Sequence, residues 1–220
     1  MGLRIPDDGL FEDYDPKIEA LQELSNIGVG HAATALSQLL NRRVDMSIPR
    51  VRFVPIADVG EYLAETPEEV VAGILQETSE DEKGVLNLLL IFDFESIKQL
   101  LGTLVASPIP SRIEDLDELS RSIIKETGNI LLIHTISAIN SFTEAKWFPH
   151  APSLAIDMVG ALTDELVSIE GDTGDKFLLV EVDIFTDEEK IKGDILMLPD
   201  RKAMNALMTT LYGENWEAMY

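Results

Sequence analysis

The chain has 220 residues, 45% of them hydrophobic, and its 40 acidic and 17 basic side chains give a formal net charge of -23. This balance argues against nucleic acid and anionic membranes as partners, because neutralising phosphates requires Lys and Arg. The lack of cysteine excludes disulfides, thiolate nucleophiles and cysteine zinc sites. The longest apolar run, residues 85–92, is too short to span a bilayer. Because the N-terminus also lacks the apolar run of a signal peptide, we expect a cytoplasmic protein.

The first half of the chain predicts a mixture of helices and strands. Residues 1–14 form an acidic tail, and Asp15 followed by Pro16 is typical of a helix start. Apolar spacing extends that helix to about Asn41. The segment 59–65 fits no single pattern. The remaining predictions are extended chain over 44–54, interrupted by Pro49, a strand over 69–76, a turn over 79–84, a strand over 85–92 and a helix over 94–104.

The second half repeats this order after a linker rich in Pro and Ser at 107–111. We predict a long helix over 115–140, extended chain over 154–159, a hairpin of strands over 177–185 and 191–198, and a helix over 200–212. We therefore expect one domain over 15–220, built from two repeats at about 15–105 and 114–213, with the strands of both repeats in one sheet.

A sparse signature occurs once in each repeat. Glu23 is followed by Asn26 and then by Pro49, and the same three residue types recur 103 residues later at Glu126, Asn129 and Pro152. The duplicated proline, at the same offset after each asparagine, is not required by helix exposure. The repeat by itself indicates common ancestry of the two halves and leaves open whether either copy is active.

Both motif helices are predicted to present a polar stripe. At 100° per residue, Glu19, Glu23 and Asn26 share one sector of the first helix, and Ser122, Glu126 and Asn129 share the same sector of the second. Polar residues on the outer face of an amphipathic helix are also common without any function. The stripes continue at Gly30, Ser37, Asn41 and Asn140, and the opposite faces carry Leu21, Leu24, Gly28, Ala32, Ala35, Leu39, Ile124, Leu131 and Ala138.

The motif stretches at 23–40 and 126–131 resemble the CheC/CheX/FliY phosphatases of bacterial and archaeal chemotaxis. The family pattern begins with Asp or Ser, followed by three intervening residues and Glu. Two intervening residues then lead to Asn, and twenty-two more lead to Pro. The second copy satisfies it from Ser122 onward, whereas Glu19 opens the first copy. The resemblance implies an α+β, internally duplicated CheC-like fold, in which two similar halves share a mostly antiparallel sheet and two long motif helices lie on its outer face.

The resemblance also implies an activity, namely hydrolysis of the aspartyl phosphate of the response regulator CheY. Asn26 and Asn129 would position the attacking water, and Glu23 and Glu126 would contact the active-site lysine of the regulator. Ser122 would support the second site. The chain would need no cofactor of its own, because the Mg²⁺ would be bound by CheY. The remaining supporting positions are Glu19, Pro49 and Pro152.

Two other functions remain open from the sequence. Such a protein can act as an adaptor that links phosphorylated CheY to the deamidase CheD, with little turnover, or as a component associated with the flagellar switch. Metal chemistry is not expected, because His31, His134 and His150 have no ligand-type spacing.

Overall fold

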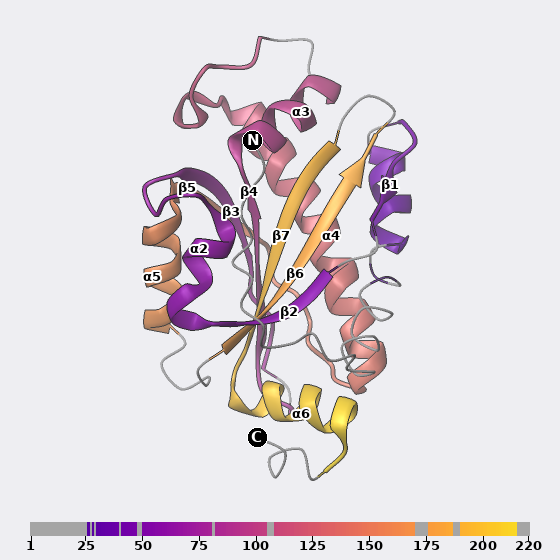
Figure 1. The fold of residues 1–220 in the computed structure, drawn as a ribbon. Helices are drawn as coiled ribbons and strands as arrows, with labels where there is room; N and C mark the ends of the chain where they lie inside the picture. The colour runs from indigo at the N-terminus through magenta and orange to yellow at the C-terminus, as the bar shows by residue number, and fades with distance from the viewer. Residues whose placement is uncertain are drawn as a thin grey trace.

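A single antiparallel sheet organises the computed structural model (Figure 1). The structure describes residues 26, 28, 30–39, 41–47, 50–80, 82–104, 108–169, 176–186 and 190–214. The seven strands lie in the order β1-β6-β7-β4-β3-β5, and β2 also pairs with β6. Their bounds are Asp45–Met46 for β1, Arg50–Pro55 for β2, Val70–Gln76 for β3, Leu86–Phe92 for β4, Ser153–Met158 for β5, Lys176–Phe185 for β6 and Lys190–Pro199 for β7.

The two halves exchange their outer strands. Each half contributes a hairpin, β3 with β4 and β6 with β7, and the hairpins meet in the middle, where β4 pairs with β7. The preceding strand of each half crosses to the other hairpin, because β2 pairs with β6 and β5 pairs with β3. The prediction that both halves share one antiparallel sheet is confirmed, and the reciprocal exchange is consistent with an internal duplication.

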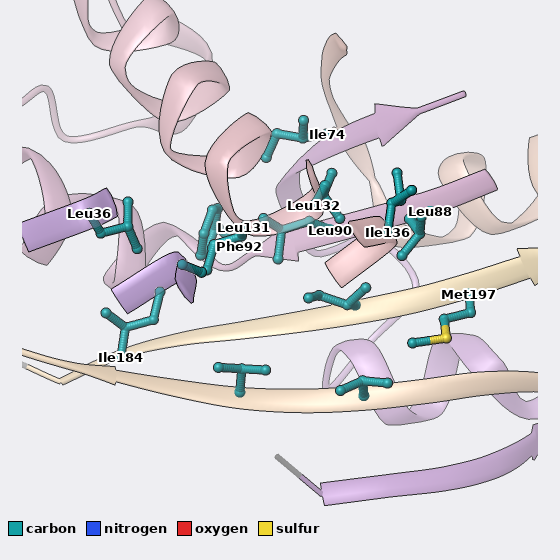
Figure 2. Packing of buried hydrophobic residues seen from close by; sticks show 14 of the residues in the cluster. Leu36, Ile74, Leu88, Leu90, Phe92, Leu131, Leu132, Ile136, Ile184 and Met197 are labelled. Atoms are coloured by element: carbon teal, nitrogen blue, oxygen red, sulfur yellow. The ribbon is translucent and has the colours of Figure 1, made fainter. Parts of the chain in front are cut away.

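Helices cover both faces of the sheet. Strand residues alternate between two apolar clusters: Leu88 and Leu90 point into the larger one, and Leu89 and Ile91 into the smaller one. The smaller cluster is closed by α2 (Val59–Leu63) and α5 (Val159–Ile169). The larger is closed by the first motif helix, helical over residues 30–39, and by α4 (Glu118–Thr143), α3 (Phe94–Leu104) and α6 (Arg201–Tyr212). Figure 2 shows Leu36 of the first motif helix and Leu131, Leu132 and Ile136 of α4 packed over Leu88, Leu90 and Phe92 of β4.

Local sequence signals account for several helix ends. Asp93 and Asp200 follow β4 and β7, and their carboxylates accept hydrogen bonds from Ser96 N at 2.6 Å and Ala203 N at 2.7 Å. These N-caps start α3 and α6 at equivalent places in the two halves. Asp117 accepts a hydrogen bond from Ser120 N at 2.8 Å. It therefore starts α4 at Glu118, three residues after the predicted start at 115.

Other elements differ from the sequence predictions. The ambiguous segment 59–65 contains the short helix α2, and 159–169 forms α5, for which the sequence offered no prediction. Two short 3-10 helices, Ile56–Asp58 and Ile113–Asp115, were also not predicted. The α5 helix packs closely on the sheet, since a Cβ on Gly73 of β3 would lie 3.1 Å from Leu162. The residues 1–14 and parts of the linker at 107–111 lie outside the described residues.

Charged side chains occupy the α2 and α5 face of the sheet where those helices do not cover it. Asp183 pairs with Lys190 at 2.9 Å, and Lys192 Nζ lies 3.0 Å from Asp194 Oδ2. Asp194 lies on the central strand β7 and is only 5% exposed. Its Oδ1 atom has no hydrogen-bond partner within the described part of the chain. Burial raises the pKa of Asp194 to about 6, with Lys192 opposing this rise.

Candidate functional site

The two motif helices cross at equivalent positions of the repeat. A Cβ on Gly28 would lie 3.0 Å from the backbone oxygen of His134 and 3.1 Å from Ala138 Cβ, so the two backbones approach closely there. His31 and His134, which are 103 residues apart in sequence, stack edge to face with ring centroids 6.0 Å apart. Burial first, and the charge of His31 second, lower the pKa of His134. Gly28 precedes His31, whereas Ala138 follows His134, so the helices run antiparallel.

This crossing separates the two candidate asparagines. Asn26 and Asn129 each lie five residues before a histidine of the stacked pair, and on antiparallel helices those positions diverge in opposite directions from the contact. The arrangement therefore holds the two asparagines apart and does not bring them into one shared pocket. Glu19, Glu23 and Pro49, the other candidate residues of the first copy, lie outside the described residues.

The side chains of the second copy reach the surface. Glu126 and Ser122 are exposed, and Glu126 forms no ion pair with any side chain that the structure describes. The Ser122 hydroxyl donates to the Glu118 carbonyl oxygen at 2.9 Å, within its own helix. Pro152 is half-buried and directly precedes β5. Glu126 is thus available to a cation on another molecule.

The two asparagines differ in exposure. Asn26 is exposed, whereas Asn129 is half-buried and its Oδ1 atom has no hydrogen-bond donor among the described residues. A half-turn about the Cβ–Cγ bond, which is a soft torsion, exchanges the positions of that oxygen and the amide nitrogen. The backbone beside Asn129 is held firmly, because a Cβ on Gly128 would lie 3.0 Å from Ile74 Cγ1 of β3. Gly128 thus fixes the height of the amide above the sheet, a role that the sequence reading did not assign.

Two residues of the predicted polar stripes have a structural role instead. Ser37 Oγ accepts a hydrogen bond from Val44 N at 3.0 Å, and Asn140 Oδ1 accepts one from Trp147 N at 3.1 Å. Both pairs span seven residues and are related by the 103-residue offset. Asn140 Nδ2 also donates to the Trp147 carbonyl oxygen at 2.9 Å. These residues tie each motif helix to the chain that follows it, so the structure accounts for two polar positions of the stripes.

The helices also end alike. Asn41 and Glu144, again 103 residues apart, adopt the left-handed conformation with φ of 47° and 57°. On the opposite helix faces, Gly28, Ala32, Ile124, Leu131 and Ala138 are buried as predicted, but Ala35 is half-buried and Leu39 is 43% exposed. In the described part of the chain, no helix is both long and apolar enough to cross a membrane.

The glycines of the first motif helix provide a stability test of this crossing. Gly30→Ala is expected to raise the free energy of unfolding by about 0.5–1 kcal/mol, because alanine favours the helix and its Cβ meets none of the described atoms within 4 Å. Gly28→Ala is expected to lower it by about 1 kcal/mol, because its Cβ presses on α4. Urea denaturation of the two variants measures both changes. Equal stabilisation by both substitutions would contradict the close contact at Gly28.

Comparisons with known proteins show the family of the chain. A family model described as the CheC-like family matches residues 19–52, which contain the first motif copy. The "CheY-P phosphatase CheC" of Bacillus subtilis (strain 168) is 30% identical over 203 residues, covering 90% of this chain and 94% of that protein. The chain belongs to the CheC-like family. The "Putative CheY-P phosphatase CheC1" of Halobacterium salinarum is 27% identical over 115 residues, covering 52% of this chain and 56% of that protein.

Solved structures of other proteins share the fold of this chain. The structure of Thermotoga maritima FliY has a TM-score of 0.66 at 16% identity, with 93% of this chain and 100% of that chain covered. The FliM middle domain from H. pylori has a TM-score of 0.60 at 8% identity, with 89% and 98% covered. At these identities the likeness concerns the fold alone.

Proposed function

We propose that this CheC-like protein hydrolyses the aspartyl phosphate of a chemotaxis response regulator of the CheY type. The observation that carries the proposal is the pairing of Glu with Asn that the sequence repeats after 103 residues, together with the exposure of Asn26, Glu126 and part of Asn129 on two crossing helices. The names of the two relatives support the same substrate.

The proposed reaction is the attack of water on phosphorus. The P–O bond to the regulator's aspartate breaks, the carboxylate leaves with the electron pair, and the water proton is released with inorganic phosphate. Such a transition state requires an in-line nucleophile and neutralisation of charge more than a covalent catalyst. The regulator would contribute the Mg²⁺ and a lysine, so the phosphatase would contribute the placement of the water.

A carboxamide suits that placement. Its oxygen accepts a hydrogen bond from the water and its nitrogen donates to a phosphoryl oxygen, without the repulsion that a carboxylate would bring to an anionic centre. In Asn129 the oxygen must first turn outward, which the soft terminal torsion permits. Orienting the nucleophile in this way can lower a barrier by several kcal/mol.

Glu126 would have a different task. Beside the phosphoryl group alone its carboxylate would be repelled, but beside the lysine of the regulator it would be attracted. The pair would thereby fix the register in which the regulator docks and bring its phosphoryl group to Asn129, three residues further along the same helix face. Glu23 would act in the same way for Asn26.

The direct test is release of phosphate from a phosphorylated CheY-type regulator. With a small amount of this chain and an excess of regulator, we expect many turnovers per chain and a shorter phosphate lifetime. Chelation of Mg²⁺ should stop the reaction, since the metal belongs to the regulator. An unchanged phosphate lifetime would contradict the proposal. If the chain binds the phosphorylated regulator without shortening that lifetime, the adaptor function or the switch-associated function is favoured instead.

A further inference from the structure

The outward face of α4 is unusually apolar around the second site. Leu119 is 57% exposed and Ile133 is 36% exposed, although both are large aliphatic side chains on a helix that also has a fully buried face. Ile123 and Ile130 lie between them and are half-buried against the core. We call these four residues, Leu119, Ile123, Ile130 and Ile133, the apolar ridge.

The apolar ridge runs beside the candidate site residues. At about 100° per residue, its four members fall within a sector of about 80° on the helix. Glu126 lies inside that sector, and Asn129 lies at about 40° from Ile133 around the axis. A molecule that contacts Glu126 and Asn129 therefore approaches the same face of the helix, where Ile130 and Ile133 are its nearest ridge residues. The ridge is thus continuous with the candidate site.

The first site lacks the outer end of this ridge. The residue 103 positions before Ile133 is Gly30, which is exposed, and no atom of the described residues lies within 4 Å of where its Cβ would be. The counterparts of the other three ridge residues lie outside the described residues. The two copies of the motif therefore differ in apolar surface at a position directly beside the reacting groups.

Charge indicates what the ridge would bind. The chain carries a net charge of -23, so a partner whose reacting group is a phosphate is repelled at long range. Apolar contact provides attraction that neither repels an anion nor weakens with salt. A ridge beside Glu126 supplies such attraction where the phosphoryl group has to approach.

We propose that the apolar ridge docks the phosphorylated regulator at the second site, through the regulator's surface next to its aspartyl phosphate. Gly30 leaves the first site with a weaker hold on the same partner. The two sites consequently bind one substrate with unequal affinity. This inference rests on the proposed function, because it names the contact surface for the substrate of that reaction.

Single-site chains allow the docking to be measured. Asn26→Ala retains the second site, and Asn129→Ala retains the first. In the Asn26→Ala chain, adding Ile133→Ser is expected to raise KM for the phosphorylated regulator about tenfold and to leave kcat unchanged, because a side chain that would be buried in the complex becomes polar.

In the Asn129→Ala chain, adding Gly30→Ile is expected to lower KM for the same regulator, because it gives the first site the aliphatic side chain that Ile133 provides at the second.

A matched control separates docking from general surface effects. Phe185 is 37% exposed, but it lies on β6 and points to the sheet face opposite α4. Phe185→Ser should therefore leave KM unchanged. Binding to a regulator activated with beryllofluoride, measured by titration, tests the same substitutions when no turnover occurs.

The outcomes distinguish the two proposals. If Asn129→Ala lowers kcat but Ile133→Ser alters neither KM nor binding, the function stands and the docking surface is wrong. If no phosphate is released while Ile133→Ser weakens binding, the docking stands and the enzymatic function is wrong. A fall in kcat at constant KM on Ile133→Ser would also overturn the docking. So would a wild-type dimer that becomes monomeric with this substitution, since the ridge would then bind a second copy of the chain.

Discussion

Phosphate release from the phosphorylated regulator is expected to fall on the order of 10²-fold in kcat when Asn26 and Asn129 are both replaced by alanine. Each substitution removes the only side chain proposed to hold the attacking water at its site, and alanine offers no hydrogen bond in its place. The single variants should each retain activity, because the crossing of the helices keeps the two sites apart. At low regulator concentration, Asn129→Ala is expected to lose more activity than Asn26→Ala, since it removes the site with the apolar ridge.

The control for this experiment is a carboxamide outside the motif. Asn205 is exposed on α6, and Asn205→Ala removes an amide that belongs to neither motif helix. It should leave kcat and KM unchanged. Full activity in the double variant would end the assignment of both asparagines, and an equal loss in Asn205→Ala would show that the assay responds to something other than the sites.

The second large effect concerns pH and Asp194. The pKa of Asp194 is raised to about 6 in the folded chain, whereas it is about 4 in the unfolded chain. Between these two pH values the folded chain therefore binds a proton that the unfolded chain has already released. Its contribution to stability is therefore complete below pH 4 and is lost as the pH rises through 6. The full difference is about 3 kcal/mol, and about 1.4 kcal/mol of it appears between pH 8 and pH 5.

The neutral variant Asp194→Asn isolates this contribution. The difference in unfolding free energy between variant and wild type should favour the variant more at pH 8 than at pH 5, by about 1.4 kcal/mol. Asp183→Asn serves as the matched control, because it removes a carboxylate of the neighbouring strand that pairs with Lys190. Equal pH slopes in both variants would assign the effect to the overall negative charge instead of to burial of Asp194.

Much of the fold follows from local patterns. The helix predicted over 94–104 has those bounds in the structure, and the hairpin predicted over 177–198 is present as β6 and β7. Short apolar runs and N-cap aspartates specify such elements without reference to the rest of the chain. The crossing of β2 and β5 to the other hairpin was not predictable in this way, because strand pairing depends on contacts between distant segments. The same holds for α5, whose position depends on the small Gly73 beneath it.

The candidate site could be predicted only in part. The 103-residue offset located Asn26 and Asn129, and applied to the histidines it would also have related His31 to His134. The exposure of Ile133 had no signal in the sequence, because an aliphatic residue in a helix is ordinarily assigned to the core. The role of Asn140 was missed for a similar reason, since a polar helix residue suggests the surface, whereas its amide binds the backbone of Trp147.

The exchange of β2 and β5 also bears on how the chain can be divided. Each hairpin has its neighbouring outer strand supplied by the opposite half, so neither half alone can complete the sheet that supports its own motif helix. A polypeptide severed between α3 and the 3-10 helix at Ile113–Asp115 should therefore persist as a two-fragment complex, held by the interlocked strands. Expressed separately, each fragment would display unpaired strand edges and associate with itself or with its missing counterpart.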